Sequence, residues 1–114
     1  MNSFLKIMQK TEKCVKKSKE LYSLLSPELQ TLGLDVREHT SSFCFQVFKN
    51  DGNIGLSISI PPDAFGNDSD SIIYETALLD SSGDLIYDDD LGYDDVKRFS
   101  DRDELDIEIK NILL

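Results

Sequence analysis

The sequence predicts a single α+β domain over residues 1–114, with a long N-terminal helix packed on a four- to five-stranded antiparallel sheet and a short C-terminal helix. Two observations lead to this fold class. Apolar residues recur at helical spacing over residues 3–25, and residues 43–87 hold strand patterns separated by strong turn signals. A chain of 114 residues that is 39% hydrophobic can bury one modest core without disulfides.

Residues 3–25 form the predicted N-terminal helix. At about 100° per residue, its apolar and small side chains fall within one arc of roughly 140°. These are Phe4, Ile7, Met8, Thr11, Cys14, Val15, Ser18, Leu21, Tyr22 and Leu25. Lysines occupy the opposite side, and only Leu24 departs from the pattern. Next, Ser26-Pro27-Glu28 has the residue types of a helix start, so it predicts that a short helix restarts there and stops at Gly33. Pro27 is expected to bend the path without having to end helicity.

The strand pattern begins with a hairpin. Residues 43–48 are apolar on both faces, Asn50-Asp51-Gly52-Asn53 is a turn signal, and residues 54–60 alternate cleanly. Ile54, Leu56, Ile58 and Ile60 define a face that the N-terminal helix is expected to cover. Gly55, Ser57 and Ser59 define a small, polar face. Leu34–Glu38 adds a candidate fifth strand.

A second hairpin is expected after the polar loop of residues 61–70. Its arms are Ser71–Leu79 and Asp84–Tyr87, joined by a turn at residues 80–83. The C-terminal segment fits two patterns, because residues 103–109 alternate as a strand would. Ser100, followed by acidic residues, is a good helix cap, and the apolar face continues past Ile109. These two features favour a helix.

The charge of the chain is divided unevenly. Residues 61–114 hold sixteen of the 22 Asp and Glu residues but four Lys or Arg, whereas residues 1–32 hold six lysines and three glutamates. An acidic half repels phosphate backbones and anionic lipids, so we expect neither direct nucleic-acid binding nor a membrane role. Small residues in the middle of the apolar face make the lysine-bearing helix more typical of a core helix than of a lipid-binding one.

The N-terminus lacks the apolar run of an export signal, and Cys14 and Cys44 lie outside any Cys-x-x-Cys motif. We therefore expect a cytoplasmic protein with two separate thiols. No catalytic site is expected, since His39 is the one histidine and no nucleophile motif, phosphate-binding loop or zinc motif occurs. A non-enzymatic chain without cofactor or metal is the resulting prediction.

The strongest candidate for function is the run from Asp80 to Asp95, which contains seven aspartates, two tyrosines and no basic residue. Tyrosines supply contact area while charges select a basic partner. The predicted partner-binding residues are Asp84, Tyr87, Asp88, Asp89, Asp90, Tyr93, Asp94 and Asp95. The same composition is also typical of an acidic loop that serves only solubility, so both interpretations stay open.

The resulting hypothesis is a small acidic protein-binding domain, inhibitor-like or adaptor-like, that engages a basic protein surface. Its size and acidity resemble in general character the compact inhibitors encoded by phages and mobile elements. One alternative is a nucleic-acid mimic that blocks a DNA- or RNA-binding protein. Another is a weak calcium-binding domain at residues 88–95, although Gly92 does not fall where an EF-hand loop requires it. We expect a monomer, or a symmetric dimer through outward-facing Cys44 and Phe48.

Overall fold

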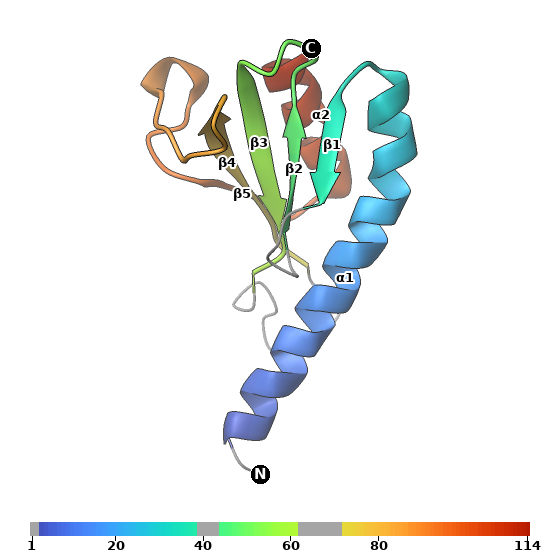
Figure 1. Cartoon of the computed structure of the whole chain (residues 1–114). Coiled ribbons are helices and arrows are strands. Elements are labelled where there is room, and N and C mark those ends of the chain that lie inside the picture. Colours follow the sequence, from blue (N-terminus) through green and yellow to red (C-terminus); the bar gives the residue numbers. More distant parts are fainter. Residues whose placement is uncertain (1–2, 39–43, 62–71) are drawn as a thin grey trace.

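The computed structural model describes residues 3–38, 44–61 and 72–114, and within its first helix it describes side chains for Gln9 and from Glu12 onward (Figure 1). The elements in chain order are α1 (Ser3–Thr31), β1 (Asp35–Glu38), β2 (Cys44–Phe48), β3 (Ile54–Ser59), β4 (Tyr74–Asp80), the 3-10 turn η2 (Asp89–Leu91), β5 (Lys97–Phe99) and α2 (Arg102–Leu113). This α+β arrangement confirms the predicted long N-terminal helix, antiparallel sheet and short C-terminal helix. The expectations for His39, for Phe43 and for residues 62–71 lie outside the described residues.

The sheet is a five-stranded antiparallel meander in the order β1-β2-β3-β4-β5, so each strand pairs with its neighbour in the chain. Phe45 pairs with Ile58 and Val47 pairs with Leu56, which places these apolar side chains on one face. Side chains from both helices join them in one buried cluster, so α1 and α2 cover the same face. The alternation predicted for residues 54–60 is therefore the observed register.

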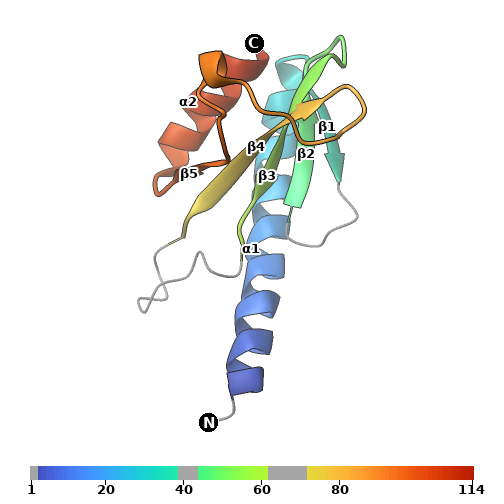
Figure 2. The same cartoon turned by 90° about the vertical axis from the view of Figure 1, so that its left-hand side faces the viewer.

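Helix α1 packs on the sheet through its C-terminal half and continues well past the strands at its N-terminal end (Figures 1 and 2). The described side chains that it buries are Cys14, Ser18, Leu21, Leu25, Ser26 and Leu29. Phe4, Ile7 and Met8 were also expected in this face, but their side chains lie outside the described part. Leu24, which broke the sequence pattern, is 63% exposed.

The expected restart of the helix at Ser26-Pro27-Glu28 was wrong, because α1 runs without interruption to Thr31; helicity does continue through Pro27, as expected. Proline removes one backbone donor and crowds the carbonyl four residues earlier, here that of Ser23. Both Pro27 and Ser23 are exposed, so water can satisfy that carbonyl and the helix continues. The predicted stop at Gly33 is confirmed: Gly33 has φ 85°, and the Leu34 amide donates to the Leu29 carbonyl at 3.1 Å.

Two expectations for the second half need correction. Asp84–Tyr87 is not a strand, because its pairing with β4 is limited to a single bridge between Leu85 and Leu79. One edge of β4 pairs with β3, and the strand that pairs with its other edge is Lys97–Phe99. The C-terminal segment is the favoured helix, but its N-cap is Asp101 rather than Ser100. The Asp101 carboxylate accepts the Asp103 amide at 2.9 Å.

The sheet face opposite the helices does not expose Phe48, which overturns the patch proposed for dimerisation. Phe48 is 0% exposed, and Cys44 is half-buried. The Phe48 ring lies across the strand pair from Gly55 and beneath the Arg37 guanidinium, which is 4.2 Å from the ring centroid. A glycine opposite an aromatic ring leaves room for the ring to cover the neighbouring strand. Neither Cys14 nor Cys44 forms a disulfide.

Candidate functional site

The segment from Asp84 to Asp95, here called the acidic loop, joins β4 to β5 and carries all the residues predicted to bind a partner. It is the orange segment that follows β4 in Figures 1 and 2. Asp84, Asp89, Asp90, Asp94 and Asp95 are exposed, and Asp88 is half-buried. Three apolar side chains are exposed among them: Tyr87 at 63%, Leu85 at 49% and Leu91 at 36%. The loop thus presents carboxylates and apolar groups together.

The chain enters the loop through a tight turn held by Asp80. One carboxylate oxygen of Asp80 accepts the amides of Ser82 at 2.9 Å and Asp84 at 3.0 Å. The Ile86 amide then donates to the Leu78 carbonyl at 2.9 Å. A short polar side chain that accepts nearby amides is the usual way to fix such a turn. The first part of the loop is therefore tied to β4 although it forms no strand.

The centre of the loop is a closed unit around η2. The Asp88 side chain caps η2 by accepting the Asp90 amide at 3.0 Å, and Gly92 ends it with φ 78°. Asp88 and Tyr93 exchange two backbone hydrogen bonds of 2.8 Å each. These bonds close the loop on itself, so Asp88 holds the loop backbone in place in addition to carrying a negative charge.

Tyr93 anchors this unit to the body of the protein. Its side chain is 0% exposed, and its hydroxyl lies 2.7 Å from the Thr76 hydroxyl and 3.5 Å from the Glu108 carboxylate. Burial raises the pKa of Tyr93 to about 12, and the nearby Glu108 charge also raises it, while the Thr76 hydrogen bond acts in the opposite direction. A fully buried side chain offers no surface to a partner, so Tyr93 leaves the set of candidate contact residues.

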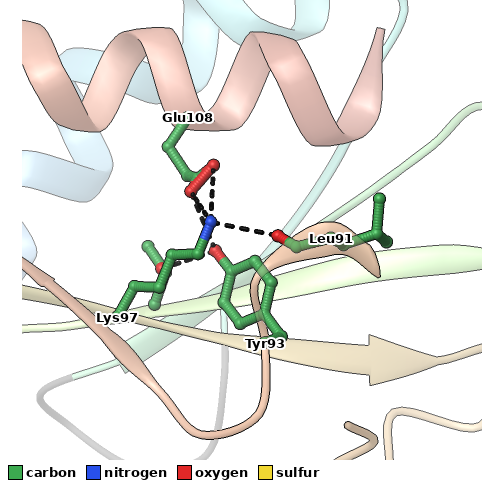
Figure 3. Close-up of polar contacts among 5 residues, drawn as sticks. Leu91, Tyr93, Lys97 and Glu108 are labelled. Carbon is green, nitrogen blue, oxygen red and sulfur yellow. Dashed lines mark hydrogen bonds and ion pairs between the residues drawn. The ribbon is translucent and has the colours of Figure 1, made fainter. Parts of the chain in front are cut away.

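Lys97 links the loop, β5 and α2 (Figure 3). Its ammonium donates to the Leu91 carbonyl at 3.1 Å and to the two Glu108 carboxylate oxygens at 2.9 and 3.3 Å. It also lies 4.5 Å from the centroid of the Tyr93 ring. The Lys97 side chain is 28% exposed and that of Glu108 is 10% exposed, so water screens this pair only partly.

The sequence pattern did not reveal these supporting residues. Thr76 and Glu108 are 17 and 15 positions from Tyr93, so no local spacing connects them. The one local signal was Lys97, the first basic residue after the acidic run. Of the eight predicted contact residues, the structure brings seven to the surface of one loop and places Tyr93 beneath them.

The acidic loop shows no metal site in the residues described. No group of three or more His, Cys, Asp or Glu side chains among them is arranged to hold an ion. The Asp80 and Asp88 carboxylates instead accept backbone amides. The calcium alternative therefore gains no support from the described part of the chain.

Comparison of the chain with protein-family models, with curated proteins and with solved structures finds no match. Within residues 3–38, 44–61 and 72–114, no helix is both long and apolar enough to pass through a bilayer.

Proposed function

We propose that the chain is a non-enzymatic protein-binding domain whose acidic loop engages a basic surface of a partner protein, in the manner of an inhibitor or adaptor. The observation that carries this proposal is the combination of exposed carboxylates with exposed Leu85, Tyr87 and Leu91 on one loop. Three of the seven large apolar side chains that are exposed in the described residues lie on this one loop, and apolar exposure rimmed by polar residues is typical of interaction sites.

The internal bonding of the loop supports the same proposal. Its backbone is closed by the Asp88–Tyr93 bridge and anchored by the buried Tyr93 side chain. Ordering a flexible loop on binding costs free energy, and a loop already fixed avoids most of that cost. The exposed carboxylates would then steer a basic partner, and the apolar side chains would supply contact area. Cys14 and Cys44 are not joined in a disulfide, which suits a cytoplasmic location.

The test is a charge-reversal series in the loop. We choose Asp89, Asp90 and Asp94 for replacement by Lys, because Asp88 caps η2 and its loss would disturb the backbone. The matched control replaces Glu12, Glu28 and Glu38 by Lys. These residues are exposed on α1 and β1, and their reversal changes the net charge by the same amount. Proteins retained by the immobilised wild type are compared with those retained by each variant, and a specifically retained protein is purified and titrated.

We expect the loop variant to lose the partner and the control to keep it, with both proteins folded by circular dichroism. Binding should weaken as salt increases, because exposed charges act mainly on the association rate. Equal retention by the loop variant would place the interface elsewhere. Competition between the chain and an oligonucleotide for the purified partner would assign the loop a nucleic-acid-mimic role, whereas simultaneous binding would exclude that role.

A further inference from the structure

We infer that Lys97 is the residue that positions the acidic loop, and that it does so by coupling the loop backbone to α2 through Glu108. The expected effect of Lys97 on partner affinity rests on the proposed function, whereas its effect on the loop backbone does not depend on that function. Lys97 lies in β5, outside the acidic loop, and is not one of the residues predicted to contact the partner. Its effect on a partner would therefore be indirect.

The contacts of Lys97 join three separate segments at one atom (Figure 3). The ammonium nitrogen donates to a carbonyl of η2, to a carboxylate of α2, and faces the ring of the anchoring tyrosine. The acceptor in η2 is the carbonyl of Leu91, whose side chain is one of the exposed apolar groups of the loop. Fixing this carbonyl therefore fixes the backbone that presents Leu91 and its acidic neighbours.

The packing of Gly92 shows how closely Lys97 sits on the loop. A Cβ atom added at Gly92 would lie 3.0 Å from both Cε and Nζ of Lys97. Gly92 also has φ 78°, a conformation that favours glycine. Glycine at this position thus permits both the end of η2 and the approach of the ammonium to the Leu91 carbonyl.

The role of Glu108 is to hold the ammonium in place. Its side chain is 10% exposed and both of its oxygens accept from Lys97. Removing one member of a largely buried pair leaves the other charge uncompensated, whereas replacing both with apolar side chains of similar size avoids that penalty. A double variant can therefore restore overall stability while the Leu91 carbonyl still lacks its donor.

The experiment measures hydrogen exchange at the loop amides of Leu91, Gly92 and Tyr93, together with urea unfolding of the whole chain. The variants are Lys97→Met and the double variant Lys97→Met/Glu108→Leu. The matched control is Arg98→Met, which removes a basic residue of the same strand that pairs with Glu75 at 2.9 Å. Because each loop amide bonds to a backbone carbonyl within the loop, its exchange reports loop opening directly.

We expect exchange at these amides to become about tenfold faster or more in Lys97→Met, as for loss of a charge-assisted hydrogen bond. Exchange should stay fast in the double variant even though its unfolding midpoint returns toward that of the wild type. The control should keep wild-type exchange in the loop. Wild-type exchange in the double variant would overturn the inference, since it would show that Lys97 acts only on overall stability.

The binding arm uses a purified partner from the charge-reversal experiment. The double variant retains every carboxylate of the loop, and we expect its affinity to fall about tenfold, in proportion to the loss of loop protection. Unchanged affinity with fast exchange would overturn the link between loop position and binding. If the Asp89, Asp90 and Asp94 variant itself keeps the partner, the proposed function fails, and the exchange results still decide the role of Lys97.

Discussion

Replacing Gly55 by alanine tests the packing on the sheet face opposite the helices. The new Cβ would lie 2.6, 2.7 and 2.9 Å from three carbons of the Phe48 ring, well inside the usual carbon–carbon contact of about 3.5–4.0 Å. The ring has little room to move, because Phe48 is 0% exposed and the Arg37 guanidinium covers it at 4.2 Å. Ring and backbone must both shift to accept one methyl group.

The expected cost follows from two opposing effects. Overpacking a closed site costs about 1–3 kcal/mol. Gly55 has no positive φ, so alanine also gains about 0.4–1 kcal/mol by restricting the unfolded chain. The overpacking is larger, and we expect a net destabilisation of about 1–2 kcal/mol. For a domain of this size, that lowers the melting temperature by about 4–8 °C.

The assay is thermal and urea unfolding of Gly55→Ala beside Ser57→Ala, a position on the same face of the same strand. The control should stay within about 0.5 kcal/mol of the wild type. Phe48→Leu removes the ring that the new methyl group would meet. We therefore expect the double variant Gly55→Ala/Phe48→Leu to lose about 1 kcal/mol less stability than the sum of the two single variants. A Gly55→Ala protein that melts like the wild type, or strictly additive effects, would refute the close contact between ring and glycine.

Three further predictions concern the core, the buried hydroxyl and the helix cap. Ile58→Asp places a carboxylate at a site with 0% exposure. Burying this charge should cost several kcal/mol of a total free energy of unfolding of about 5–15 kcal/mol, so we expect far-ultraviolet circular dichroism to show an unfolded chain. A cooperative melt near the wild-type temperature would contradict the strand register. Burial raises the pKa of Tyr93 from 10.0 to about 12, so the unfolded chain loses its phenolic proton first. The protonated Tyr93 side chain contributes fully to the free energy of unfolding below pH 10. About 2–3 kcal/mol of that free energy should be lost between pH 10 and 12 in the wild type but not in Tyr93→Phe. Urea midpoints that change in parallel for both proteins over this range would contradict the raised pKa of Tyr93. Asp101→Ala should cost about 1 kcal/mol in urea unfolding and Ser100→Ala much less, because the Asp101 side chain accepts the Asp103 amide in the first turn of α2. Equal costs would leave the assignment of the cap unsupported.

Much of the fold could be predicted because its signals are local. The lysine and apolar faces of α1, the Asn50–Asn53 turn and the alternation through β3 each depend on residues close in sequence. The helix continues through Pro27 at a point where both Pro27 and Ser23, whose carbonyl loses its donor, are exposed to water. Exposure of that kind is a property of the packed molecule, so the residue types of a helix start were not sufficient to locate one.

The remaining features depend on tertiary partners. Lys97–Phe99 is a three-residue strand with two charged side chains, and its pairing with β4 gives it a regular structure that its own sequence does not indicate. Tyr93 lies among aspartates and was expected at the surface for that reason. Its ring instead joins the core cluster, and its hydroxyl bonds with Thr76 and Glu108, which are distant in the chain. The exposed carboxylates of the candidate site were predictable from composition, whereas the contacts that fix their loop were not.

The meander order of the sheet has a consequence for how the chain folds. Every strand pairs with a strand adjacent to it in sequence, so no pairing has to wait for a distant part of the chain. Loop closure over short separations costs little entropy, and topologies rich in such contacts fold fast for their size. We expect the β2–β3 hairpin, closed by the tight turn at Asn50–Asn53, to offer the earliest nucleus. The two helices lie at the ends of the described chain, so each can dock on the sheet without threading past a formed element.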